Sequence, residues 1–133
     1  MVTHKTWYSV LCTLLGALFI FVSVFMIVNP ETMIPSLMTG FTVDQGDIVP
    51  LHFAFLGNNI RNIVFGGFII FFAFRSTKTV VLLISMRLFI EVLDLFGSLA
   101  YHPTFGDFIP SFIVMIGLEI FLILKGYQVI AKA

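Results

Sequence analysis

Four long runs of apolar residues alternate with short polar connections along the chain. The runs cover about residues 7–29, 53–74, 79–101 and 110–130, and each is long enough for a helix that crosses a bilayer. In lipid the backbone must satisfy its hydrogen bonds internally, so runs of this kind predict helices. We therefore expect an all-α fold, a four-transmembrane-helix bundle, in one domain over residues 1–133.

Composition supports a location in the membrane. Hydrophobic residues make up 59% of the chain and charged residues only 11%, whereas soluble domains carry about 25% charged residues. The first run exceeds twenty residues, too long for the core of a secretory signal, and we expect it to be a true span. The single cysteine, Cys12, excludes an internal disulfide and a cysteine-based metal cluster.

The charges outside the apolar runs divide cleanly by side if all four runs cross. One side then carries only basic residues and the other only acidic ones, and cytoplasmic segments are the ones enriched in Lys and Arg. We expect both termini to be cytoplasmic and the acidic loops 30–51 and 102–109 to be non-cytoplasmic. The basic residues are Lys5, Arg75, Lys78, Lys125 and Lys132, and the acidic residues are Glu31, Asp44, Asp47 and Asp107.

Two features of the acidic loops are candidates for function. A short amphipathic piece, residues 33–38, is a candidate lid along the interface, and a plain connector is the alternative. His52 and His102 lie near acidic residues, but two histidines without fixed spacing are a weak metal signal. We predict no metal site, and the sequence identifies no cofactor.

Five ionisable residues fall inside the apolar runs. Each costs about 2.5 to 3.5 kcal/mol at the centre of a bilayer, so pairing or water is required. Three of them, together with Ser98, occupy one face of the third run because their spacing is three or four residues. The five are Arg61, Arg87, Glu91, Asp94 and Glu119.

Depth in the membrane predicts how these five residues pair. Arg61 and Asp94 lie about two turns from the non-cytoplasmic side, whereas Arg87, Glu91 and Glu119 lie nearer the midplane. We expect Arg61 to pair with Asp94, and Arg87 to pair with Glu91 or Glu119. One carboxylate is then left over, and either Glu119 or Glu91 is the best candidate for a ligand-binding or proton-titrating group.

The second run supplies polar and small residues beside these charges. Asn58 and Asn62 share a helix face with Arg61 and are candidate supporting polar residues. Gly66 and Gly67 are candidate packing positions, because glycine permits close approach of another backbone in membranes.

Scattered glycine and arginine positions over most of the chain carry a family resemblance. They are Asn29 and Pro30 at the end of the first run, then Gly40, Gly57, Arg61, Gly66, Arg75 and Arg87. In these positions the chain resembles the DoxX-like superfamily of small four-helix integral membrane proteins. The resemblance implies a left-handed four-helix bundle with core positions at Arg61, Gly66, Arg87 and Asp94. Some members are associated with quinone-linked oxidoreductases or membrane redox complexes and others with receptor assembly; Glu91 and Glu119 match no motif of the family.

Three functions compete for the buried charges. The first is a binding or accessory protein that holds a small quinone-like or lipid-like amphiphile or docks a membrane partner. The second is a small proton-coupled transporter or channel, acting as a homo-oligomer, in which Glu91 or Glu119 titrates. An intramembrane enzyme using Glu91 or Asp94 as an acid ranks below both, because no nucleophile or cofactor motif accompanies it. The alternative to all three is that the charges only fix the register of the bundle. No nucleic-acid partner is expected.

Overall fold

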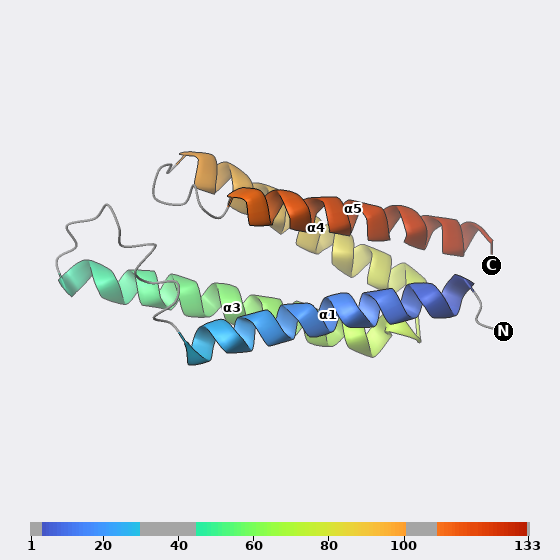
Figure 1. Ribbon diagram of the computed structural model, residues 1–133, viewed down its shortest axis with the longest axis horizontal. Coiled ribbons are helices and arrows are strands. Elements are labelled where there is room, and N and C mark those ends of the chain that lie inside the picture. The colour runs from blue at the N-terminus through green and yellow to red at the C-terminus, as the bar shows by residue number, and fades with distance from the viewer. Residues whose placement is uncertain (1–3, 30–44, 101–108, 133) are drawn as a thin grey trace.

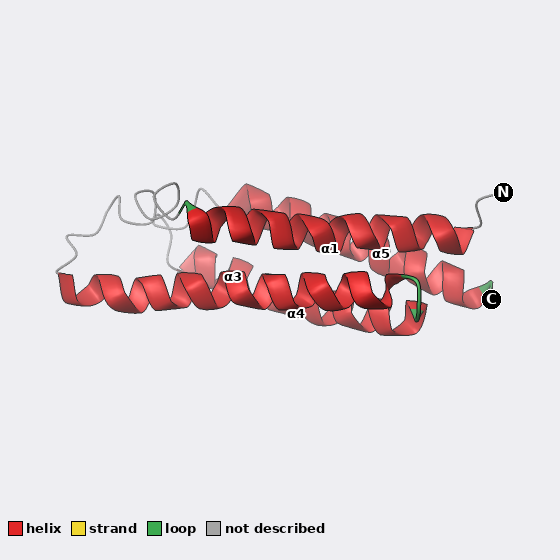
Figure 2. Cartoon of the chain, turned by 90° about the horizontal axis from the view of Figure 1, so that it is seen from below, coloured by secondary structure: helices red, strands yellow, loops and turns green. Residues whose placement is uncertain are grey.

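Four helices lie alongside one another and form an elongated bundle (Figures 1 and 2). The structure is a computed structural model that describes residues 4–29, 45–100 and 109–132, and it contains no strand in these ranges. The helices are α1 (His4–Val28), α3 (Gln45–Ala73), α4 (Thr77–Ala100) and α5 (Ile109–Ala131). The all-α class and the number of helices predicted from the apolar runs are confirmed for the described residues.

Three of these helices are long and apolar enough to cross a membrane. The qualifying segments are Lys5–Val28, Leu56–Ala73 and Pro110–Ala131. The outer surface fits this finding, since large apolar side chains such as Phe21, Phe89 and Val114 point away from the bundle. α4 has a similar length, but Arg87, Glu91 and Asp94 interrupt its apolar sequence.

The helix boundaries agree with the hydrophobic pattern except at the start of α3. The pattern predicts a loop as far as residue 51, but α3 begins at Gln45. The prediction was wrong because Asp47 and Pro50 end the apolar run without ending the helix. Pro50 is the sixth residue of the helix, where it cannot donate an amide hydrogen to the carbonyl of Gly46, and α3 nevertheless begins before it.

The connection between α3 and α4 is a tight turn with a defined cap. The Ser76 hydroxyl accepts a hydrogen bond of 3.2 Å from the backbone amide of Thr79, as expected of an N-cap residue. Arg75 folds back on α3, donating to the carbonyl of Phe71 at 2.8 Å and covering the ring of Phe71. This turn makes α3 and α4 antiparallel neighbours.

The bundle consists of two closely packed helix pairs. α1 packs mainly on α3 and α4 mainly on α5, while α3 with α4 and α1 with α5 make fewer contacts. Gly16 and Gly66 allow the first pair to approach, since a Cβ on Gly66 would lie 2.6 Å from the Gly16 carbonyl oxygen. The two pairs therefore meet along a looser seam, where polar groups have room.

The apolar core occupies one half of the bundle. Its buried side chains lie on the first part of α1, the end of α3, the start of α4 and the second half of α5. They include Phe19, Ile69, Ile84 and Leu122. The two ion pairs, Arg61 with Asp94 and Arg87 with Glu91, lie in the other half. Polar and apolar packing are therefore separated along the bundle axis.

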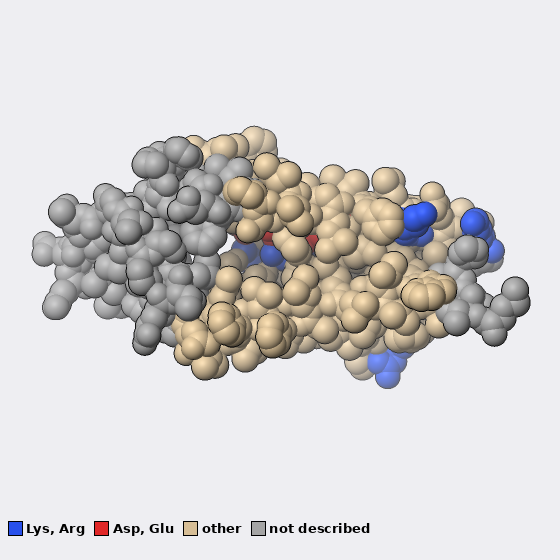
Figure 3. Space-filling view, viewed as in Figure 1, with Lys and Arg blue, Asp and Glu red and all other residues tan. Residues whose placement is uncertain are grey.

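The described basic residues outside the seam gather at one end of the bundle, here called the basic end (Figure 3). It contains the first turn of α1, the turn between α3 and α4, and the last part of α5 (Figure 1). Its basic residues are Lys5, Arg75, Lys78, Lys125 and Lys132. Asp47 belongs to the opposite end, at the start of α3. The candidate lid 33–38, His102 and the other acidic loop residues lie outside the described residues, as do the side chains of Asp47 and His52.

Candidate functional site

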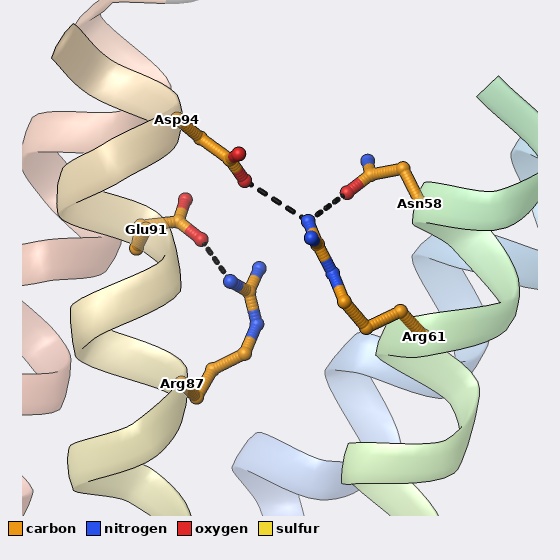
Figure 4. A network of polar contacts seen from close by, with 5 residues as sticks. All are labelled: Asn58, Arg61, Arg87, Glu91 and Asp94. Atoms are coloured by element: carbon orange, nitrogen blue, oxygen red, sulfur yellow. Dashed lines mark hydrogen bonds and ion pairs between the residues drawn. The ribbon is translucent and has the colours of Figure 1, made fainter. Parts of the chain in front are cut away.

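The five ionisable residues of the apolar runs come from three helices. Arg61 lies on α3, Arg87, Glu91 and Asp94 lie on α4, and Glu119 lies on α5. The spacing on α4 places its three charged residues along one face, which is turned toward α3 (Figure 4).

Arg61 and Asp94 link the two helix pairs. A guanidinium nitrogen of Arg61 lies 3.0 Å from a carboxylate oxygen of Asp94. The same nitrogen donates to the side-chain oxygen of Asn58, one turn away on α3 (Figure 4). Both ion-paired side chains are about one-third exposed, at 35%. The pairing of Arg61 with Asp94 predicted from depth is observed, and Asn58 contacts Arg61, with which it shares a helix face.

Arg87 and Glu91 form a second, more deeply buried ion pair. They are one helical turn apart on α4, and their side chains are only 6% and 4% exposed. The guanidinium also lies 5.2 Å from the centre of the Phe19 ring on α1, a cation–π distance. Nε and Nη1 of Arg87 and Oε2 of Glu91 are buried without a well-aligned hydrogen bond among the described residues. The pair thus keeps hydrogen-bonding capacity that its own helix does not satisfy.

Glu119 is the carboxylate left over by the pairing. It is fully buried on α5, and neither carboxylate oxygen has a hydrogen-bond partner in the described part of the chain. It lies within electrostatic range of Arg87 and Glu91. A lone ionised carboxylate in such a place costs several kcal/mol, so a proton or a cation must compensate it.

A cavity of about 390 Å³ lies in the seam between the helix pairs, and we call it the charged cavity. One wall is polar and comes from α3 and α4. Figure 3 looks onto the face formed by α1 and α5, where charged atoms are visible at the bottom of an opening between these helices. The polar wall consists of Asn58, Asn59, Asn62, Arg87, Glu91 and Asp94.

The opposite wall of the charged cavity is apolar and comes from α1 and α5. It has two polar exceptions, the buried Ser23 on α1 and the exposed Ser111 on α5. Glu119 does not line the cavity; Met115, one turn away on the same helix, does. The main apolar residues are Leu18, Phe19, Val22, Met26, Phe112 and Met115.

The structure places the remaining candidate residues in different surroundings. Asn62 lines the cavity, and its buried Oδ1 has no hydrogen-bond partner among the described residues. Gly66 contacts Gly16, whereas a Cβ on Gly67 would meet nothing within 4 Å. Ser98 belongs to α4, but its side chain lies outside the described part of the structure.

Asn59 is a cavity residue that the sequence prediction did not include. Its side chain is only 1% exposed, more buried than that of either Asn58 or Asn62. The sequence could have indicated this position, because Asn59 lies seven residues before Gly66 and positions seven apart share a helix face. The face that packs against α1 therefore passes through Asn59 as well as Gly66.

The described residues contain no group of three or more His, Cys, Asp or Glu side chains arranged to hold a metal ion. Comparison with known proteins finds no family model, no curated protein and no solved structure that matches the chain. The geometry of the charged cavity is therefore the basis for assigning a function.

Proposed function

We propose that this protein is an integral membrane binding or accessory protein whose charged cavity holds the polar part of a small amphiphile. The observation that carries the proposal is the cavity itself, which joins a polar wall to an apolar wall at the buried charges. Its volume of about 390 Å³ falls in the usual range of small-molecule sites, about 300 to 1,000 Å³. A quinone ring or a small lipid headgroup has a suitable size and polarity.

The polar wall offers both donors and acceptors to such a ligand. Among the described residues, Nε of Arg87 and the side-chain oxygen of Asn62 have no hydrogen-bond partner. Each arginine already has a carboxylate partner, so the wall presents fixed dipoles more than free positive charge. This balance favours a neutral, oxygen-bearing head over a strongly anionic one, with the apolar tail against α1 and α5.

Entry from the bilayer is consistent with the side opening between α1 and α5 (Figure 3). An amphiphile dissolved in the membrane could insert its head there without leaving the lipid phase. The same polar surface is the proposed contact if the natural ligand is a membrane protein partner.

We further propose that all four helices span the membrane, with both termini cytoplasmic. The support is the gathering of Lys5, Arg75, Lys78, Lys125 and Lys132 at the basic end. The positive-inside rule assigns such an end to the cytoplasm. Single cysteines at residues 44 and 78, in a Cys12→Ala background, test this arrangement. Labelling of both by a membrane-impermeant thiol reagent from the same side would refute it.

Membership of the DoxX-like superfamily is also a proposal. Its support is the location of the implied core positions, since Arg61, Arg87 and Asp94 lie at the seam and Gly66 lies at a close contact of α3 with α1.

Native mass spectrometry of the protein extracted gently from its own membrane tests the binding proposal. We expect a small amphiphile on the wild type that is lost in Arg87→Leu and partly kept in Arg87→Lys. Arg87→Leu leaves Glu91 unpaired, so the double variant Arg87→Leu/Glu91→Leu is needed as a folded comparison. Lys78→Gln, remote from the cavity, is the matched control and should keep the ligand.

Two results would contradict the proposal. One is an empty wild-type protein whose partners are also unchanged by the variants at residues 87 and 91. The other is a bound amphiphile that the folded double variant retains. Either result would leave the five charges with a structural role in assembly of the bundle.

A second candidate function, a proton-coupled transporter or channel, is favoured by one observation. Glu119 is fully buried and has no hydrogen-bond partner in the part of the chain that the structure describes, and it lies near an ion pair. This arrangement is suited to a carboxylate that gains and loses a proton. Four helices are few for a pathway, so a homo-oligomer is required, and the open faces at Gly67 and Gly117 are available for it. A pH-dependent flux in liposomes that Glu119→Gln abolishes would support this function, and the absence of such a flux would exclude it.

A further inference from the structure

A second groove lies between α1 and α5 at the basic end, far from the charged cavity along the bundle. We call it the lysine groove. It has a volume of about 240 Å³ and exists because α1 and α5 pack less closely than either helix packs on its main partner. The residues that the argument uses are Trp7, Tyr8, Lys125, Gln128 and Lys132.

One edge of the lysine groove carries positive charge that the described residues do not neutralise. Lys125 and Lys132 are two turns apart on α5, about 10 Å along the axis, with Gln128 between them. Lys125 Nζ lies 3.4 Å from the Gln128 side-chain oxygen and 5.7 Å from the Phe121 ring centre. Neither lysine is in an ion pair with a described carboxylate. An anionic group between the two lysines would be complementary.

The opposite wall, formed by α1, adds an interfacial aromatic ring, while the Tyr8 hydroxyl is turned into the bundle beside Gly126. Tyr8 is 3% exposed, and its hydroxyl has no hydrogen-bond partner among the described residues, although the weakly polar thiol of Cys12 lies nearby. Trp7 is 58% exposed at the same level. Tryptophan prefers the headgroup region of a bilayer, so the groove lies where lipid headgroups are found.

The lysine groove continues into an apolar one that extends toward the middle of the membrane. This leucine groove has a volume of about 190 Å³ and shares Leu11 and Phe121 with the lysine groove. It runs along the same seam of α1 and α5 and is lined only by apolar side chains, including Leu14, Leu118 and Leu122. A soluble anion would make no polar contact in this apolar extension, whereas part of an acyl chain could pack there.

We propose that the two grooves together bind one anionic glycerophospholipid, with its phosphate between Lys125 and Lys132 and one acyl chain in the leucine groove. The site is separate from the charged cavity: its charge is unbalanced and positive, and its ligand is a membrane lipid at the basic end. The lipid would fill the loosest contact between the two helix pairs and so fix their separation.

Lipid retention by the purified, delipidated protein tests this proposal. Phosphatidylglycerol and phosphatidylcholine with identical chains are added in turn, and bound lipid is measured by native mass spectrometry. We expect phosphatidylglycerol to be retained preferentially by the wild type. Lys125→Gln/Lys132→Gln should reduce this retention roughly ten- to thirtyfold, as expected for two lysines at a lipid surface.

Matched variants separate the lipid site from general charge and from the charged cavity. Arg75→Gln/Lys78→Gln removes the same charge from the same end but lies outside the groove, and it should leave retention unchanged. Leu118→Trp fills the leucine groove without a change of charge and should reduce retention of the lipid. Arg87→Lys, in the charged cavity, should have no effect on it.

The proposal would be overturned if the wild type retained the two lipids equally or if Lys125→Gln/Lys132→Gln left retention unchanged. It would also be overturned if Arg75→Gln/Lys78→Gln reduced retention as much as Lys125→Gln/Lys132→Gln does. Displacement of the lipid by millimolar inorganic phosphate, with no effect of Leu118→Trp, would instead identify a site for a soluble anion. Because the test reads lipid at the basic end, it can fail while the charged cavity still binds its own ligand.

Discussion

Arg61 on α3 and Asp94 on α4 form an ion pair of 3.0 Å that bridges the two helix pairs of the bundle. The residues are 33 positions apart in sequence, but their antiparallel helices bring them to the same depth. Their partial exposure, 35% for each side chain, places the pair at the border of the charged cavity. Asp94 lines the charged cavity, and its ion pair with Arg61 joins the two helices that supply the polar wall.

A double-mutant cycle of Arg61→Leu and Asp94→Leu should measure this bridge. We expect a coupling free energy of about 1 kcal/mol in unfolding from mild detergent, since interhelical polar contacts in membranes have values of this order. The exposure of the pair keeps the value low. Additive effects of the two substitutions would mean that the contact does not stabilise the bundle.

Arg87→Leu should destabilise the protein far more than a break of the Arg61 pair, by about 3 to 5 kcal/mol, because it leaves Glu91 buried and unpaired. Arg87→Leu/Glu91→Leu should recover most of that loss, since it replaces a buried ion pair by apolar side chains. Unfolding titrations of the two variants provide the comparison. A double variant as unstable as Arg87→Leu would show that the pair contributes more than charge compensation.

Glu91 and Glu119 should substitute for one another in compensating Arg87. When both carboxylates are ionised, the three residues carry a net charge of −1, so removal of either carboxylate leaves a balanced pair. We expect Glu91→Gln and Glu119→Gln each to change the free energy of unfolding by about 1 kcal/mol or less. The double variant should lose about 3 to 5 kcal/mol, because Arg87 is then buried without a carboxylate.

The same unfolding measurement decides this prediction. A large loss from Glu119→Gln alone would mean that Glu119 has a partner of its own. Simple additivity of the two substitutions would mean that Glu119 lies too far from Arg87 to compensate it.

Gly66→Ala and Gly67→Ala are adjacent substitutions with opposite expected effects. At Gly66 the new Cβ would lie 2.6 Å from the Gly16 carbonyl oxygen, so α1 and α3 must separate, at a cost of about 1 to 3 kcal/mol. At Gly67 the Cβ meets nothing, and a gain of up to about 1 kcal/mol is expected from helix propensity. Thermal unfolding of the two variants side by side tests the difference, and a loss at Gly67 would indicate a contact with a second copy of the chain.

The pairing of Arg61 could be predicted from the sequence, whereas the partner of Arg87 was left open between two glutamates. Apolar runs fix how deep each residue lies, and depth selected Asp94 for Arg61 before any contact was known. Depth did not choose between Glu91 and Glu119 for Arg87, because both lie at the same level. Glu91 lies beside Arg87 because the two residues are four positions apart on one helix. The packing of α5 buries Glu119 in the bundle, where it has no hydrogen-bond partner among the described residues.

The sequence by itself determined the helices, their approximate ends and the level of each charged residue, because these follow from local hydrophobicity and a constant rise per residue. It failed at the start of α3, where Asp47 and Pro50 precede the apolar run but lie within the helix. The tertiary structure decided which helices pack closely. Gly16 and Gly66 join α1 to α3, while α1 and α5 are left with the grooves between them. Such packing depends on the shapes of side chains from distant segments, and hydrophobic periodicity carries no information about how those shapes fit together.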